Sequence, residues 1–383
     1  MKKLNSQLIL EIVIVLFWTS EYAHVPYFTP YLRFLGTGAT LVGMIVAAYG
    51  FTQMMLRIPI GIATDVTGAY RFVIISGLFF TTVSSLGLFI TTNIVLIFIC
   101  RVLAGVASST WIASTVAYMT YYPVSDSVHA SARLNALNNG GKLLAFAAGG
   151  AAAAAAGYRA ALFVSFAAGL VGLVLAFFVE KVEIRRERLS IRKVILAMTS
   201  ARVIIPSLLM AAQQMALHAT VFSFTSDIAR QAGASSGMLS VLTAVFTAVQ
   251  ILSAVLISSP GFLRLRRNRA LAGGYALLAV YMLMLGYSGD VRVMLVGQAA
   301  AAVGSAILAS LLLSECVRDV PDGERSTVLG TFQAVCGLGM TVGPIMMGCL
   351  MESFGSTVSC TVFAGATAIL AAAVLLFWRR DAV

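Results

Sequence analysis

Two ionisable side chains stand three residues apart in the first apolar stretch of the chain. Glu21 and His24 share one face of a helix at this spacing, and Pro26 and Pro30 follow them. Prolines inside an apolar helix bend or break it and free backbone carbonyls toward a cavity. A glutamate in an apolar cavity resists ionisation, so Glu21 is a candidate to bind a proton in competition with a substrate cation. The alternative is that Glu21 lies near the outer end of the helix and is simply solvated.

Further polar and aromatic side chains lie in other apolar stretches. His218 follows Gln214 by one helical turn, and Gln213 precedes both. Ionisable groups inside membrane spans are functional candidates, and amide and aromatic groups line pockets that accept mixed ligands. The predicted substrate- or proton-binding set is Glu21, His24, Arg101, Trp111, Tyr118, Gln213, Gln214, His218 and Gln298. Either aromatic residue of this set could equally lie at the membrane interface, and a lone histidine in an apolar segment is usually structural.

The composition shows which solvent surrounds these groups. Of the 383 residues, 60% are hydrophobic and 11% are charged, and the mean hydropathy is +0.94. Because soluble domains are about a quarter charged, this composition excludes a soluble enzyme, a secreted disulfide scaffold and a nucleic-acid-binding domain. The five cysteines lie in or beside apolar runs without CxxC spacing, so we expect no metal site. The sequence has no Walker loop, zinc signature or nucleophile elbow, so we expect neither a cofactor nor an enzyme.

Apolar runs divided by short polar, glycine or proline breaks form two sets of six. A membrane span needs about 20 apolar residues. The runs fall at about 8–32, 39–64, 71–90, 93–121, 134–156 and 159–180, and then at about 203–227, 236–257, 269–288, 291–316, 326–352 and 356–378. A weak internal similarity, which places Asn138 on Gln333, indicates that the two sets are repeats. The sequence therefore predicts an all-α membrane protein with twelve transmembrane helices in two pseudo-symmetric halves, 1–180 and 201–383, joined by a basic linker at 181–200.

The basic residues predict the orientation in the membrane. Of the 26 Lys and Arg residues, most fall in segments on the side of the N-terminus, including the linker. The opposite loops carry Arg33, Arg159, Arg230 and Arg292. Because Lys and Arg accumulate in cytoplasmic loops, we expect both termini in the cytoplasm and the chain in the cell membrane, either the inner or the plasma membrane.

The most specific motif stands between the second and third runs and reads Gly61-Ile-Ala-Thr-Asp65-Val-Thr-Gly68-Ala-Tyr-Arg71. The two glycines permit a sharp reversal, and Asp65 can pair with Arg71 or cap a neighbouring helix. The spacing resembles the GxxxDxxGxxR loop of the major facilitator superfamily. That resemblance implies a gate that stabilises one side of an alternating-access transporter. Arg57, one turn before the motif, is expected to brace this gate.

Two shorter motifs resemble those of the family's drug or metabolite:proton antiporters. Arg101-Val-Leu-Ala-Gly105 is similar to their RxxxG motif, and the resemblance implies a role for Arg101 in proton coupling. The alternative is an interfacial arginine that snorkels from the helix end. Gly339-Met-Thr-Val-Gly343-Pro344 is similar to their GxxxGP motif, but it falls in the second half instead of on the fifth helix. Its alternative role is close helix packing with a kink at Pro344.

Together these features predict a secondary active transporter that works by alternating access. The resemblance favours proton-coupled efflux of drugs or metabolites, with a small-molecule substrate and protons as the coupling ion. The alternative within the superfamily is a uniporter or symporter for a sugar, an organic anion or an amino-acid-like metabolite. Because long soluble loops are absent from the sequence, we expect a monomer whose surroundings are the lipid bilayer, with no nucleic acid as partner.

Overall fold

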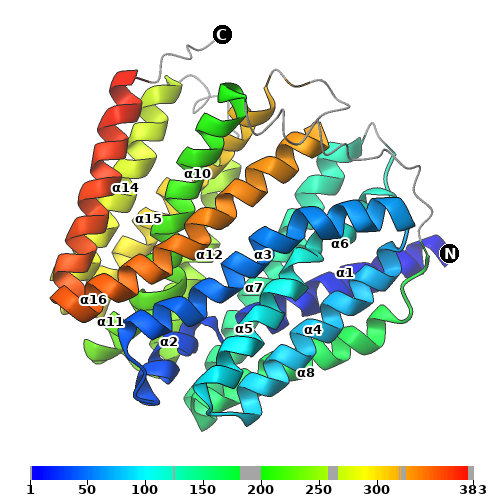
Figure 1. Ribbon diagram of the computed structural model, residues 1–383, viewed down its shortest axis with the longest axis horizontal. Helices are drawn as coiled ribbons and strands as arrows, with labels where there is room; N and C mark the ends of the chain where they lie inside the picture. Colours follow the sequence, from blue (N-terminus) through cyan, green and yellow to red (C-terminus); the bar gives the residue numbers. More distant parts are fainter. Residues whose placement is uncertain are drawn as a thin grey trace. The chain divides into compact units, whose positions relative to one another are not determined.

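The computed structural model describes residues 2–123, 126–181, 200–257, 266–318, 320 and 325–377. Within these ranges the chain forms long α-helices joined by short turns, with one π-helical segment (Figure 1). The all-α class predicted from the apolar runs is therefore confirmed for the described residues. Apart from Lys181 and Ser200, the predicted linker lies outside them, so the domain limits stay predictions.

The described helices are suited to a membrane. Ten candidate spans are long and apolar enough to cross one. One of them belongs to α16 (Arg325–Phe377), a continuous run of 53 residues. A straight helix of that length would measure about 80 Å, whereas a hydrocarbon core is about 30 Å thick. Gly355 interrupts the run with a φ of 78°, so α16 is two helices that meet at this glycine. The count of twelve spans stays a prediction.

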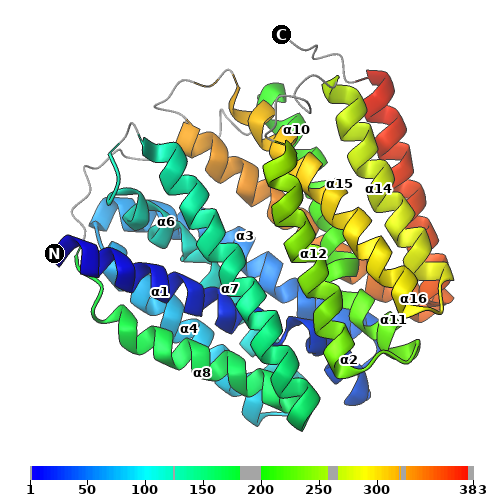
Figure 2. The ribbon, with the colours of Figure 1, turned by 180° about the vertical axis from the view of Figure 1, so that it is seen from behind.

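The chain divides into two compact units, here called unit 1 and unit 2. Unit 1 comprises residues 1–27 and 48–190, as far as these are described. Its helices are α1 (Lys2–Tyr22), the second part of α3 (Ala39–Thr67), α4 (Tyr70–Ile90), α5 (Ile94–Ser109), α6 (Trp111–Met119), α7 (Ser127–Ala156) and α8 (Tyr158–Ala176). Within unit 1, α1 packs beside α7 and α8 (Figure 2).

The first membrane helix is interrupted where the prolines predict a break. α1 ends at Tyr22, residues 23–24 form a turn, and α2 (Val25–Phe34) begins directly before Pro26. Proline is tolerated in the first turn of a helix, where its missing N–H has no acceptor to lose. The amide of Tyr27 then donates to the carbonyl of His24 across the break, 3.0 Å away. The interruption therefore lies next to Glu21 and His24.

Small residues set how closely the helices of unit 1 approach. A Cβ on Gly141 of α7 would stand 2.7 Å from the carbonyl oxygen of Val15 and 2.9 Å from Cβ of Trp18, both on α1. The Thr19 hydroxyl donates to the Gly141 carbonyl at 3.1 Å, so a hydrogen bond closes the same contact. This close approach places the residues around Gly141 directly against α1.

Unit 2 comprises residues 28–47 and 191–383, again as far as described. Besides most of α2 and the start of α3, it holds α10 (Ala201–Ala219), the π-helix η2 (Thr220–Phe224), α11 (Thr225–Gln231), α12 (Ser236–Ile257), α14 (Arg267–Tyr287), α15 (Val291–Val317) and α16. Figures 1 and 2 show α14 and the end of α16 side by side. Arg33 of α2 lies 3.7 Å from the buried carboxylate of Asp227 on α11.

Candidate functional site

Glu21 is enclosed at the end of α1, so the alternative of a solvated helix end is not what the structure shows. Its side chain is buried, and Oε1 accepts a hydrogen bond of 2.6 Å from the hydroxyl of Thr81 on α4. Oε2 is also buried and has no hydrogen-bond partner among the described residues. An unsatisfied carboxylate oxygen in a membrane interior is costly unless a proton, water or ligand reaches it.

His24 and Arg101 are joined directly. Arg101 of α5 is buried, and its Nη1 lies 3.2 Å from Nε2 of His24. A guanidinium can only donate, so Nε2 accepts and the imidazole proton is on Nδ1. Nδ1 lies 3.1 Å from the hydroxyl of Ser165 on α8, which can accept that proton's hydrogen bond. These contacts define a neutral His24 with one tautomer.

Arg101 has an aromatic neighbour as well. Its guanidinium lies 4.9 Å from the ring centroid of Tyr49 on α3, a cation–π contact, and the Tyr49 hydroxyl donates to Ser108 at 2.8 Å. Arg101 is also close enough to act electrostatically on Glu21. The structure therefore gathers Glu21, His24 and Arg101 from α1, the α1–α2 turn and α5, rather than leaving Arg101 to snorkel to an interface.

Trp111 belongs to an aromatic group that extends from α1. Its ring meets that of Trp18 edge-on at 5.1 Å, and Trp18 in turn lies 5.6 Å from Tyr22. Lys142 of α7 places its ammonium 4.9 Å from both the Trp18 and the Tyr22 ring centroids. The sequence analysis did not single out Lys142. The signal that could have found it was an unpaired lysine inside an apolar run.

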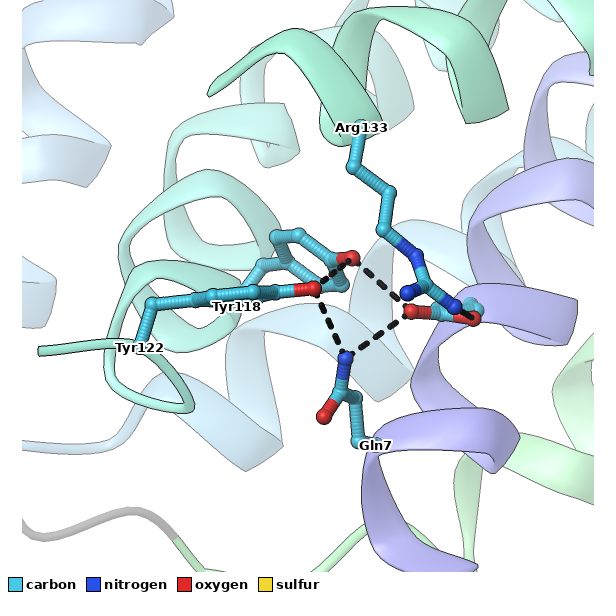
Figure 3. A network of polar contacts seen from close by, with 5 residues as sticks. Gln7, Tyr118, Tyr122 and Arg133 are labelled. Carbon is cyan, nitrogen blue, oxygen red and sulfur yellow. Dashed lines mark hydrogen bonds and ion pairs between the residues drawn. The ribbon is translucent and has the colours of Figure 1, made fainter. Parts of the chain in front are cut away.

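Tyr118 is placed in a hydrogen-bond network instead of an open pocket. Figure 3 shows this network, in which the buried carboxylate of Glu11 accepts bonds from Tyr118 at 2.8 Å, Gln7 at 3.1 Å and Arg133 at 3.0 Å. Tyr122 contacts both Tyr118 and Gln7, at 3.1 and 2.9 Å. Because its donors come from α1, α6 and α7, Glu11 ties the ends of three helices together.

The predicted gate motif covers the last turns of α3, the two-residue turn at Gly68 and Ala69, and the start of α4. Gly68 has a φ of 68°, in the left-handed region that favours glycine, and the turn ends at Tyr70. Asp65 accepts a hydrogen bond of 2.6 Å from the Tyr70 hydroxyl, and Arg71 donates to the carbonyl of Phe177 at 2.5 Å. The sequence suggested Arg71 or a helix terminus as the partner of Asp65. The partner in the structure is the Tyr70 hydroxyl instead.

Two other residues of the gate prediction contact α5 and α6. Gly61 faces Ile112, whose side chain would lie 3.4 Å from an added Cβ. Arg57 is buried, and its Nη2 donates a long hydrogen bond of 3.5 Å to the carbonyl of Ser108. Arg57 therefore links α3 to the end of α5, one turn before the motif.

In unit 2, amide side chains meet at one serine. Gln213 of α10 donates to the hydroxyl of Ser305 on α15 at 2.8 Å, and Gln250 of α12 donates to the same oxygen at 2.8 Å. Gln298 of α15 is buried, and its Oε1 has no hydrogen-bond partner among the described residues. The sequence pointed to Gln213 and Gln298 but missed Gln250 and Ser305, whose types are common in membrane helices.

His218 stands where α10 changes its winding. Its Nδ1 donates to the carbonyl of Gln214, one turn earlier, at 3.1 Å, and the π-helix η2 follows directly. The ring of Phe222 lies 5.1 Å away, and the Ser223 hydroxyl donates to the carbonyl of His218. π-Helical turns inside membrane helices are frequent at functional sites.

The second-half glycine motif packs α16 against α10. A Cβ on Gly339 would collide with the backbone of Ala211, and one on Gly343 with the backbone of Met215. The carbonyl of Pro344, the next residue, faces Gly43 of α3 within unit 2. The structure thus places these residues at close helix contacts.

The arrangement holds a buried carboxylate, a buried guanidinium and an ammonium against aromatic rings, which are groups whose chemistry suits protons and small charged ligands. Among the described residues, no group of three His, Cys, Asp or Glu side chains could hold a metal ion. The fold and its candidate spans define a multi-pass helical membrane protein.

Comparison with known proteins gives the family. The model of the Major Facilitator Superfamily matches residues 10–224 and 194–383. The chain therefore belongs to the Major Facilitator Superfamily. A search of curated protein sequences finds no match.

Solved structures share the fold across nearly the whole chain. The nucleoside transporter NupG has a TM-score of 0.77 and 12% identity, covering 98% of this chain and 99% of that one. A POT family transporter in complex with a thioalcohol-conjugated peptide has a TM-score of 0.79 and 13% identity, covering 98% and 96%. A human organic anion transporter has a TM-score of 0.68 and 14% identity, covering 97% and 99%. At such low identities the likeness concerns the fold alone.

Proposed function

We propose that this chain is a proton-coupled secondary transporter, and that Glu21 is the carboxylate that binds the coupling proton. The observation that carries the proposal is the burial of Glu21 with one oxygen held by Thr81 and the other without a partner. Burial disfavours the ionised carboxylate, whereas the Thr81 hydroxyl and the Arg101 guanidinium favour it. Because these influences oppose each other, both protonation states are within reach during a transport cycle.

The groups that face Glu21 fit this role. Arg101 of α5 supplies a fixed positive charge, and Tyr22 and Tyr49 supply hydroxyls that remain neutral at ordinary pH. His24 accepts from Arg101 and therefore holds the guanidinium in place. A proton and a positively charged substrate would then exclude each other at Glu21, which couples their movement in opposite directions. This is the mechanism by which the chain would export a drug or metabolite.

The transport cycle that we propose is alternating access of two pseudo-symmetric six-helix halves. The break of α16 at Gly355 supports twelve spans, because it yields two helices of membrane length; α7, with 30 residues, is the remaining candidate. The distribution of basic residues supports cytoplasmic termini in the cell membrane. The gate turn at residues 61–71 would then lie on the cytoplasmic side, and the monomer would be the working unit.

A second candidate is carriage of an organic anion, by symport or uniport. Lys142 favours it, since this ammonium rests on aromatic rings and pairs with no carboxylate among the described residues. In that case the proton at Glu21 would accompany the substrate instead of opposing it. The two candidates share Glu21 as the proton site and differ in the sign of substrate charge.

Efflux of a lipophilic cationic dye from cells that express the chain tests the export proposal. Wild type and Glu21→Gln are compared under an imposed pH gradient, with Glu180→Gln as control because Glu180 is exposed. The export candidate predicts gradient-dependent efflux in wild type and in the control, and none in Glu21→Gln. Dye retention equal to empty-vector cells would remove cationic export, and efflux that survives in Glu21→Gln would remove Glu21 as the coupling group.

A further inference from the structure

Lys142 is a charged group that the proton mechanism leaves without a task. It lies near the middle of the 30-residue helix α7, so it does not belong to either end of that helix. The contact of Gly141 with α1 places the neighbouring Lys142 against that helix. The Lys142 ammonium lies 4.9 Å from the ring centroids of Trp18 and Tyr22. Acidic side chains of the described part of the chain form ion pairs elsewhere, and none with Lys142.

The walls around this ammonium are aromatic. Trp111 of α6 meets the Trp18 ring edge-on at 71°, and Phe146, one turn after Lys142, meets Tyr22 at 6.2 Å and 73°. Tyr22, Trp111 and Lys142 are only partly buried, so part of each of these side chains is accessible. An aromatic wall with one cation fits a ligand that has a planar apolar body and a negative end.

A second unsatisfied donor lies in the same group. Trp18 is 5% exposed, and its indole Nε1–H is buried and has no acceptor among the described residues. A buried donor that lacks an acceptor costs free energy, and an ammonium that is partly withdrawn from water is costly unless it is paired. The two cation–π contacts offset part of the cost of the lysine. One bound anion would offset the cost of the Trp18 donor and the cost of the Lys142 charge, because an anion accepts hydrogen bonds and carries the opposite charge.

We propose that Lys142, Trp18, Tyr22 and Trp111 form the binding site for a carboxylate-bearing substrate with an aromatic or similarly flat apolar body. This inference rests on the proposed function, since it takes the chain to be a transporter, and it selects the organic-anion candidate over the cationic one. Lys142 pairs with the carboxylate, and the rings enclose the apolar body. A lipophilic cation would meet the repulsion of Lys142 at the same place.

Equilibrium binding to the purified full chain tests the site. The probe is 3-nitrobenzoate, which quenches tryptophan fluorescence; two of the three tryptophans of the chain, Trp18 and Trp111, line the site. The neutral analogue 3-nitrobenzamide has the same ring without the charge. Wild type is compared with Lys142→Gln, with Lys142→Arg, which keeps the charge, and with Lys181→Gln, which removes an exposed lysine.

We expect saturable quenching by 3-nitrobenzoate in wild type and a loss of affinity of about tenfold or more in Lys142→Gln, because a charge-assisted hydrogen bond is removed. Lys142→Arg and Lys181→Gln should stay within about threefold of wild type, and 3-nitrobenzamide should bind weakly to every variant. Equal affinity of wild type and Lys142→Gln for 3-nitrobenzoate would overturn the inference. The inference would also be overturned if wild type bound 3-nitrobenzoate and 3-nitrobenzamide equally well, or if 3-nitrobenzoate gave no saturable quenching.

Two checks keep this test separate from folding and from proton coupling. Lys142→Met is a second charge-removing variant, used if Lys142→Gln does not elute as a monodisperse species. Removing a partly buried charge that has no carboxylate partner among the described residues is not expected to unfold the chain. The binding assay uses no pH gradient and leaves Glu21 intact. Lys142-dependent binding without any proton-coupled transport would therefore reject the proposed function alone. Proton-coupled transport without Lys142-dependent binding would reject this inference alone.

Discussion

At the scale of single residues, the protonation of His24 follows from its neighbours rather than from its burial. Arg101 donates to Nε2, so the proton must be on Nδ1, facing Ser165. The chain has three histidines, so ¹⁵N NMR of the imidazoles is resolvable, and His24→Gln assigns the signal. We expect the neutral Nδ1–H tautomer at pH 7.5 in wild type. A neutral Nε2–H tautomer or an imidazolium would contradict the arrangement of Arg101 and His24.

Glu11 has a structural role that differs from that of Glu21, although both lie on α1. The Glu11 carboxylate accepts from Tyr118, Gln7 and Arg133, so every change of its charge disturbs three helices (Figure 3). We expect Glu11→Gln to lower the free energy of unfolding by about 1–3 kcal/mol. Thermal unfolding in detergent measures this loss. The surface variant Glu180→Gln should stay within about 0.5 kcal/mol of wild type.

A Glu11→Gln protein that unfolds at the wild-type temperature would show that the network contributes nothing to stability. If the folded variant also lost the dependence of transport on the pH gradient, Glu11 would be part of proton coupling. We expect that dependence to require Glu21 and not Glu11.

At the scale of elements, the contact between α1 and α7 is the feature on which the Lys142 site depends. Ala at Gly141 would place a methyl group against the Val15 carbonyl and the Trp18 side chain, at distances of 2.7 and 2.9 Å that cannot be kept. We expect Gly141→Ala to destabilise the chain by about 1–3 kcal/mol, because the helices must separate. Thermal unfolding in detergent and 3-nitrobenzoate affinity should both fall.

Gly140 offers a matched control one residue earlier. A Cβ there would meet nothing within 4 Å, so Gly140→Ala should be neutral or stabilise the helix by about 0.5–1 kcal/mol through its better helix propensity. Equal effects of the two substitutions would mean that α1 and α7 do not approach each other as closely as described.

The sequence predicted part of the candidate site for identifiable reasons. Glu21 and His24 were found because a spacing of three is local, and Arg101 because its motif resembles that of a known family. Lys142 and Glu11 gain their meaning from contacts between α1 and helices more than a hundred residues away in the chain. Such contacts leave no periodic signal, and the same holds for the meeting of Gln213 and Gln250 at Ser305.

At the scale of the whole molecule, the helical class and the apolar runs could be predicted because the membrane imposes helix length and hydropathy. The break at Gly355 also has a sequence signal, since glycine adopts a positive φ at little cost. The hairpin of residues 28–47, which groups with unit 2, could not be predicted. Its place depends on contacts such as those of Gly43 with Pro344, which no local pattern records.

The predicted topology can be tested with single cysteines in a chain whose five native cysteines are replaced. Thr92, between α4 and α5, should face outward, and Lys181, after α8, should face the cytoplasm; both are exposed. A membrane-impermeant maleimide should label Thr92→Cys in intact cells and Lys181→Cys only after permeabilisation, because basic segments stay in the cytoplasm. The reverse pattern would invert the orientation, and labelling of both from outside would refute the span count.

Proton coupling through Glu21 is the central claim, and transport by purified chain in liposomes under an imposed pH gradient tests it most directly. The substrates are a lipophilic cationic dye and 3-nitrobenzoate, each corrected for protein-free liposomes. We predict that wild type accumulates at least one of them against its concentration gradient. Glu21→Gln should still exchange that substrate in counterflow but should no longer accumulate it. Accumulation by Glu21→Gln equal to that of wild type would contradict the claim.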